Sequence, residues 1–183
     1  MRKLIHFITG MLLLVAASGC TVYSAAVDER NVKTIASDTK LKLTIEKRFV
    51  EDDTVKALNI SAFVYDSNAF LTGEYGTDAE RRQAIKIAGQ VEGVKSVTPY
   101  LLAKKNGDPC GLTDNVTLAS KVKTALIKDK ELWAPNINVE AVQCNIVLLG
   151  IVGSKFQVGK AIAHAKAVEG VRDVISYLRV ESR

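Results

Sequence analysis

The chain has 183 residues, of which 48% are hydrophobic and 25% charged, and its 25 Lys+Arg exceed its 20 Asp+Glu to give a formal charge of +5. This composition is globular, which excludes a disordered or collagen-like chain, and the length suits one ordinary domain or two small ones. With only two His and three Cys, a His/Cys zinc cluster has almost no ligands, and the small total charge does not by itself indicate nucleic-acid binding.

Residues 1–19 have the pattern of a secretory signal peptide. Two basic residues are followed by an apolar run that ends in small residues before Cys20. The run is too short for a comfortable membrane span, and such a segment is excluded from the fold. The exit Ala17-Ser18-Gly19-Cys20 resembles the lipobox of bacterial lipoproteins, although Leu is commoner where Ala17 stands. The alternative is ordinary secretion with Cys20 as an incidental thiol.

The lipobox resemblance implies that Cys20 carries acyl chains and that residues 20–36 are a tether. Each buried methylene contributes about 0.8 kcal/mol, so two or three chains hold a protein stably on a membrane where one does not. In enterobacterial lipoproteins an Asp after the Cys retains the protein in the inner membrane, whereas this chain has Thr21. The resemblance therefore implies a lipid anchor in the outer membrane, facing the periplasm.

The rest of the chain is a duplicated module. Shifted by 77 positions, the second half aligns with the first without a gap. The matching segments include Leu71-Thr72-Gly73 with Leu148-Leu149-Gly150, and Glu92-Gly93-Val94 with Glu169-Gly170-Val171. This repetition predicts one module over 37–104 and a second over 113–183. The turn formers in 105–112 indicate a linker between them.

Each copy begins with a predicted helix and a β-hairpin. Apolar residues spaced i, i+4, i+8 predict an amphipathic helix in each copy: Leu41, Ile45 and Phe49 in the first, and Leu118, Val122 and Leu126 in the second. Ser37 or Asp38, and Thr113 or Asp114, are candidate N-caps. Two short apolar runs around polar turns at 66–68 and 143–145 predict the hairpins.

A second helix and a last strand complete each copy. Thr77 with Glu80, and Ser154 with Gln157, fit the capping box that starts a helix. Gly93 and Gly170 stand where a helix C-terminal glycine belongs. The predicted fold class is therefore α+β, with two tandem α-β-β-α-β modules, each a three-stranded mixed sheet covered by two helices.

This order of elements, the Leu-x-Gly motifs that end at Gly73 and Gly150, and the Glu-Gly-Val helix exits resemble the BON domain family. The resemblance covers residues 37–180, and two such domains behind a lipoprotein signal are similar to the dual-BON outer-membrane lipoproteins. It implies phospholipid-membrane binding and envelope stress tolerance, without enzymatic activity or a cofactor. In those lipoproteins the second domain contacts the membrane.

The charge distribution also singles out the second module. Eleven basic and eleven acidic residues cancel over 37–112, whereas 113–183 has ten basic residues against seven acidic. The candidate lipid-binding residues lie in and just after its first helix: Lys121, Lys123, Lys128 and Trp133, the one Trp of the chain. A basic residue near an anionic lipid surface is worth about 1 kcal/mol, and an indole suits the headgroup boundary. The alternatives are an ordinary solvated helix and a Trp133 buried in the core.

Two cysteines remain after the anchor, Cys110 in the linker and Cys144 in the second hairpin turn. In the oxidising periplasm a disulfide between them would staple the linker to the second module. Two distant free thiols are the alternative.

The sequence contains no set of residues spaced as in a catalytic site, so we expect that the protein is not an enzyme. His164 is the one His after the signal, and we expect it to be structural or solvated. We also expect no metal site and no nucleic-acid partner. The expected function is anionic phospholipid binding in support of envelope integrity, and the alternative is a protein-interaction adaptor for outer-membrane protein assembly without direct headgroup binding.

Overall fold

The computed structural model describes residues 31–55 and 59–180. The predicted signal peptide, the candidate lipidation site Cys20 and the tether up to residue 30 lie outside these residues. Within the described ranges, no helix combines the length and the hydropathy that a bilayer crossing requires.

The predicted α-β-β-α-β order is confirmed in both halves of the chain. The first module consists of α2 (Val32–Glu51), β1 (Ile60–Tyr65), β2 (Asn68–Tyr75), α3 (Asp78–Gly89) and β3 (Ser96–Ala103). The second consists of α4 (Leu112–Lys128), the 3-10 turn η2 (Ala134–Asn136), β4 (Ile137–Val142), β5 (Asn145–Val152), α5 (Lys155–Lys166) and β6 (Asp173–Val180). In each sheet the first two strands form an antiparallel hairpin, and the third strand pairs parallel to the second.

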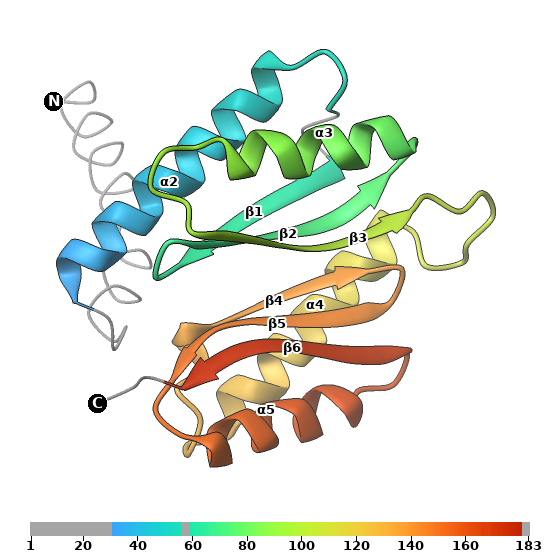
Figure 1. Ribbon diagram of the computed structural model, residues 1–183. Helices are drawn as coiled ribbons and strands as arrows, with labels where there is room; N and C mark the ends of the chain where they lie inside the picture. The colour runs from blue at the N-terminus through green and yellow to red at the C-terminus, as the bar shows by residue number, and fades with distance from the viewer. Residues whose placement is uncertain (1–30, 56–58, 181–183) are drawn as a thin grey trace, which may run out of the picture.

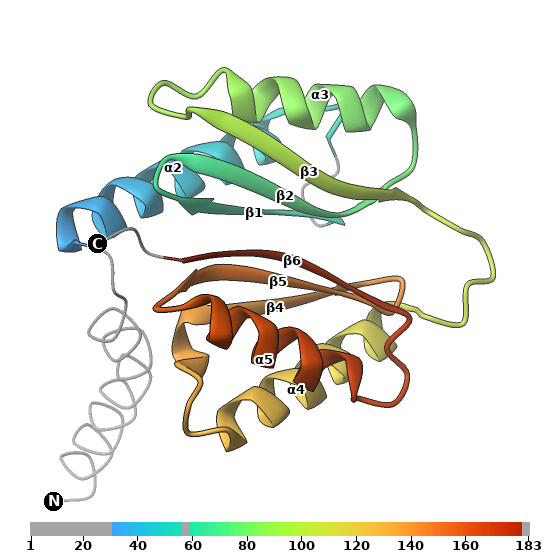
Figure 2. The ribbon, with the colours of Figure 1, turned by 60° about the horizontal axis from the view of Figure 1, so that its bottom comes forward.

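The two modules stack sheet against sheet in four layers. Figure 1 shows α2 and α3 on the outer side of the first sheet, and Figure 2 shows α4 and α5 on the outer side of the second. The aromatic and aliphatic side chains between the sheets form a separate cluster of Tyr65, Phe70, Val147, Leu149 and Ile151, flanked by Phe63, Tyr100 and Tyr177. Each sheet is therefore covered on both faces.

The first helix of each module begins earlier than predicted. Helix α2 starts at Val32, inside the predicted tether, and its N-cap Asn31 accepts a hydrogen bond from the Lys33 amide at 2.9 Å. Helix α4 starts at Leu112, and its N-cap position is occupied by a glycine. The predicted N-caps, Ser37 or Asp38 and Thr113 or Asp114, are therefore wrong. The apolar periodicity located the buried face of each helix, but it did not locate the first turn.

Asp38 lies inside α2 and holds the hairpin turn instead. Its carboxylate accepts hydrogen bonds from the backbone amides of Asp66 and Ser67, both at 2.8 Å. These two turn residues have φ values of 51° and 66°, a conformation that non-glycine residues adopt at a cost. At the equivalent position of α4, Asn115 accepts from the Cys144 amide at 2.9 Å. In both modules the first helix thus fixes the hairpin by one polar side chain.

The glycines of the Leu-x-Gly motifs permit a close backbone contact. Gly73 has a φ of 137°, and a Cβ there would lie 2.0 Å from the Asn59 carbonyl oxygen. Gly150 repeats the arrangement, with a φ of 141° and the same distance to the Asn136 oxygen. No side chain fits at either position. Gly93 and Gly170, both at φ 96°, lie in the turns beyond α3 and α5 and face Leu41 and Leu118.

The second helix of each module starts at the predicted capping box. Thr77 Oγ1 accepts from the Glu80 amide at 3.1 Å, and Ser154 Oγ accepts from the Gln157 amide at 3.3 Å. The glutamate and glutamine side chains in turn accept from the amides just before the caps, Gly76 and Gly153. These contacts fix the loop that leads from the central strand into α3 or α5.

Candidate functional site

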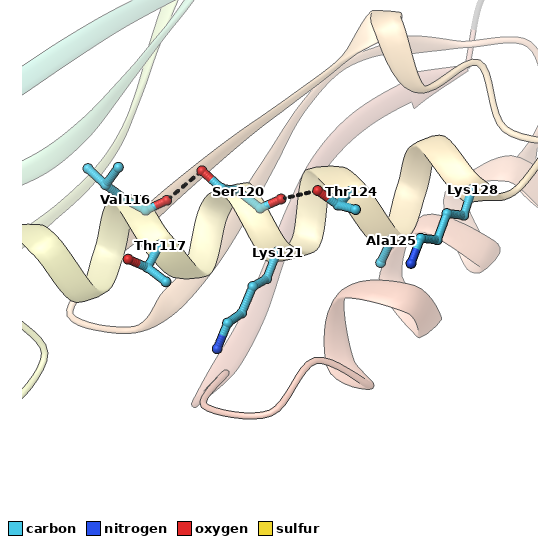
Figure 3. Close-up of a pocket in the computed structure, with 7 residues that line it drawn as sticks. All are labelled: Val116, Thr117, Ser120, Lys121, Thr124, Ala125 and Lys128. Atoms are coloured by element: carbon cyan, nitrogen blue, oxygen red, sulfur yellow. Dashed lines mark hydrogen bonds between the residues drawn. The ribbon is translucent and has the colours of Figure 1, made fainter.

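The outer side of α4 carries a shallow depression of about 620 Å³. Its lining residues all come from this helix: Val116, Thr117, Ser120, Lys121, Thr124, Ala125 and Lys128 (Figure 3). Leu118, Val122 and Leu126 occupy the opposite face and are buried in the module core. A single amphipathic helix therefore presents a mixed polar and apolar face to solvent.

Lys121 and Lys128 lie on the same side of α4, two turns apart (Figure 3). Neither ammonium group forms an ion pair with a described residue, and both side chains are exposed. The neighbouring hydroxyls are satisfied within the helix, since Ser120 donates to the Val116 carbonyl at 2.9 Å and Thr124 donates to the Ser120 carbonyl at 2.8 Å. The face thus offers two available positive charges to an external anion.

Lys123 does not belong to this face, which corrects the sequence-based expectation. Its side chain is half-buried, and its ammonium donates to the carbonyl oxygens of Ala134 and Ile137, both at 2.5 Å. Burial lowers the pKa of this ammonium. Lys123 therefore joins α4 to η2 and β4. Its spacing of two residues from Lys121 already places it about 200° around the helix, so the helical period was the signal for separating the two.

Trp133 lies just before η2 and is 47% exposed. This exposure contradicts the alternative in which the indole is part of the core. Three aliphatic residues of α4 are also exposed, namely Leu112, Val116 and Ile127. Sequence reasoning missed them, although their positions are out of phase with the buried Leu118, Val122 and Leu126.

The loop between α4 and η2 is held by an ionic cluster. The Asp129 carboxylate lies 2.7 Å from both Lys160 Nζ and His164 Nε2 of α5. Lys160 and then His164 hold the pKa of Asp129 well below its usual range. His164 therefore has a structural role as a partner of Asp129, in agreement with the expectation of a structural or solvated histidine. Among the described residues, no group of three or more His, Cys, Asp or Glu is placed to hold a metal ion.

Cys110 and Cys144 form a disulfide in the structure, with Cα atoms 5.6 Å apart. Cys144 is buried in the second module, and Cys110 packs against the same core. Nearby, Arg172 donates two hydrogen bonds to the Asp108 carboxylate, at 3.0 and 2.9 Å, and one to the Gln143 carbonyl. The linker is therefore attached to the second module at both Asp108 and Cys110.

A sequence model described as the BON domain matches residues 37–104 and 114–182. The chain belongs to the BON domain family. Both BON domains coincide with the two stacked modules, and the Leu-x-Gly glycine of each lies where the second strand of the hairpin closely contacts the residue just before the first strand.

Two curated BON-containing relatives resemble most of this chain. It is 29% identical over 146 residues to osmotically-inducible protein Y of Escherichia coli, covering 79% of this chain and 73% of the relative. It is 25% identical over 174 residues to outer membrane lipoprotein DolP of Haemophilus influenzae, covering 94% of this chain and 90% of the relative. Among solved structures, a chain of CdsD from the type III secretion system of Chlamydia trachomatis is 13% identical, with a TM-score of 0.34 over 78% of this chain and 92% of that one.

Proposed function

We propose that this BON protein is lipid-anchored at Cys20 on the periplasmic side of the outer membrane, binds anionic phospholipid through the outer face of α4, and supports envelope integrity. The observation that carries the proposal is the pair of available ammonium groups, Lys121 and Lys128, on one side of α4, with the exposed Val116 at the opposite edge of the same solvent-facing surface. The name of the relative DolP, an outer membrane lipoprotein similar over most of this chain, supports the location.

The chemistry of the α4 face suits a bilayer surface. Each basic residue near an anionic headgroup layer contributes about 1 kcal/mol, and exposed aliphatic side chains gain from entering the acyl boundary. Such a contact is weak by itself. An acyl anchor keeps the module close to the bilayer, so a weak contact is enough to orient the protein there.

Vesicle flotation of residues 21–183, which lack acyl chains, tests the α4 contact. With vesicles of equal parts phosphatidylethanolamine and phosphatidylglycerol, we expect the wild-type protein to float and the Lys121→Glu, Lys128→Glu variant to remain in solution. A matched control is Lys40→Glu, Lys47→Glu, which reverses two lysines on α2 at the same spacing. Equal flotation of the wild-type protein and the α4 variant would contradict the α4 contact, whereas a wild-type protein that stays in solution would favour a protein-interaction adaptor.

Membrane fractionation of cells tests the anchor separately. We expect Cys20→Ala to move the protein from the outer-membrane fraction into the soluble fraction. Wild-type protein that is soluble in the periplasm would exclude acylation. Envelope support is tested by detergent sensitivity of cells that lack the gene, which the wild-type gene should reverse and the Lys121→Glu, Lys128→Glu variant should not.

A further inference from the structure

One end of the second module gathers exposed aromatic and aliphatic side chains from separate segments. Phe156 in the first turn of α5 and Ile127 in the last turn of α4 are each 61% exposed, and Trp133 follows in the connecting loop. Figures 1 and 2 both show the end of α4 and the start of α5 at the same end of the module. We name this end the α4–α5 tip, made of residues 127–133 and 155–160.

Lys160 joins the two parts of the α4–α5 tip. Its ammonium lies 5.4 Å from the centre of the Phe156 ring, 2.7 Å from the Asp129 carboxylate and in contact with the Glu131 carboxylate. Gln157 Nε2 also donates to the Glu131 carbonyl at 3.0 Å. Lys160 and Gln157 therefore connect the first turn of α5, which carries Phe156, to the loop that carries Trp133. The one exposed acid of the tip, Glu131, shares Lys160 with Asp129.

The duplication supplies an internal comparison for this surface. At the offset of 77, three basic residues of the tip correspond to three acidic residues of the first module: Lys128, Lys130 and Lys155 to Glu51, Asp53 and Asp78. The two aromatic residues correspond to non-aromatic ones, Trp133 to Lys56 and Phe156 to Ala79. The structure supports this equivalence, since Gln83 donates to Asp52 at 2.6 Å where Lys160 pairs with Asp129. The same fold therefore carries an acidic end in one module and a basic, aromatic end in the other.

We propose that the α4–α5 tip inserts into the anionic phospholipid bilayer, with the Phe156 and Trp133 rings at the boundary between headgroups and acyl chains. This inference rests on the proposed function and deepens it, because it adds α5 and the connecting loop to a contact assigned only to α4. Aromatic rings flanked by ammonium groups match the bilayer interface, where apolar carbon lies below a layer of phosphates. Lys128, Lys130 and Lys155 lie level with that anionic layer.

Tryptophan fluorescence tests insertion at Phe156, since Trp133 is the one Trp of the chain. The reporter is Trp133→Phe, Phe156→Trp in residues 21–183, and the matched control is Trp133→Phe, Ala79→Trp, which places the indole at the equivalent turn of the first module. Vesicles contain equal parts phosphatidylethanolamine and phosphatidylglycerol, with or without brominated acyl chains. We expect the reporter emission to shift to the blue and to be quenched by bromine, and the control emission to change in neither way.

Binding of substituted proteins gives a second measurement on the same vesicles. We expect Phe156→Ser to weaken binding about tenfold, as loss of a buried aromatic side chain predicts. Reversal of Lys128, Lys130 and Lys155 to glutamate should weaken it on the order of 100-fold or more. Ala79→Ser is the matched control and should bind like the wild-type protein.

The outcomes separate this inference from the proposed function. If the wild-type protein floats with vesicles and the Lys121→Glu, Lys128→Glu variant does not, but the reporter at position 156 is not quenched, the tip does not insert, while the α4 contact stands. If the wild-type protein does not float, both proposals fail. A blue shift that appears without vesicles and grows with protein concentration would show that a second copy of the chain covers the tip. That result would also overturn the inference.

Discussion

The side-chain amide of Asn138 in the second module donates a hydrogen bond to the Tyr65 hydroxyl in the first, with the nitrogen 2.6 Å from the oxygen. A second contact crosses the same junction, where Gln143 Nε2 donates to Glu74 Oε1 and to the Ala103 carbonyl, both at 2.8 Å. The Phe70 and Tyr177 rings, one from each sheet, lie 5.4 Å apart. Buried polar contacts and an apolar cluster therefore join the two modules.

A charge placed in this cluster should separate the modules. Leu149 is buried between the sheets, and Leu149→Glu introduces a carboxylate into this apolar cluster, where its burial is unfavourable. We expect the radius of gyration from small-angle X-ray scattering to rise while the circular dichroism spectrum keeps its helix and strand signals. Leu43→Glu, on the exposed face of α2, is the matched control. An unchanged scattering profile for Leu149→Glu would contradict this role of the cluster.

The order of elements within each module was predictable because local patterns determine it. The i, i+4, i+8 spacing of Leu41, Ile45 and Phe49 marks one helix face, and the capping boxes at Thr77 and Ser154 mark two helix starts. Each of these signals lies within a few residues of the chain. The duplication strengthened them, since each pattern occurs twice at the same offset.

The stacking of the modules depends on contacts between distant residues and was not predicted. One signal was present, since Ile146 to Val152 is apolar at every position except Gly150, and such a run indicates a strand buried on both faces. The candidate site was predicted in part for a similar reason. The charge distribution indicated α4, but only the position around the helix separates Lys123 from the exposed lysines. No local sequence pattern predicts that the first turn of α5, with Phe156, lies near the Asp129 loop.

Alanine at Gly73 should destabilise the first module. A Cβ at this position would lie 2.0 Å from the Asn59 carbonyl oxygen, and the positive φ adds strain, so we expect Gly73→Ala to lower the free energy of unfolding by about 3 kcal/mol or more. Gly159 is the matched control, because a Cβ there meets nothing within 4 Å inside helix α5. Gly159→Ala should raise stability by about 0.5–1 kcal/mol. Urea denaturation measures both, and equal stability of the two variants would contradict the close contact.

Substitution of Lys123 should affect stability, whereas substitution of Lys121 should affect lipid binding. Lys123→Met removes the donor to two carbonyl oxygens, so we expect a loss of about 1.5–3 kcal/mol in the free energy of unfolding. Lys121→Met changes an exposed side chain and should alter stability by less than about 0.5 kcal/mol, while weakening vesicle binding. Thermal denaturation and flotation of the same two proteins check this. Similar stability of both variants would contradict the structural role of Lys123.

Reduction of the disulfide should destabilise the second module more than the first. The bridge joins cysteines 34 residues apart in the sequence, and closing a loop of this length is worth about 3 to 4 kcal/mol. We expect dithiothreitol to lower the denaturation midpoint of the wild-type protein and to leave that of Cys110→Ser unchanged. Mass spectrometry of protein purified from the periplasm should find no free thiol at either position. Two free thiols there would exclude the bridge.

The Asp129 carboxylate should make stability depend on pH and on salt. Its pKa is lower in the folded protein than the value of about 3.9 expected after unfolding, chiefly because of Lys160. The stabilisation is therefore complete above the unfolded pKa and is lost as pH falls below about 4 toward the folded pKa. We expect Asp129→Asn to flatten the fall in melting temperature below about pH 5, and high salt to weaken the wild-type effect by screening the ion pair.

Asp52 is the matched control, because its pKa is lowered chiefly by the uncharged Gln83 side chain. Asp52→Asn should therefore lower the melting temperature by a similar amount at low and high salt. Equal salt dependence at the two positions would contradict an ionic role for Lys160 in holding the loop that carries Trp133.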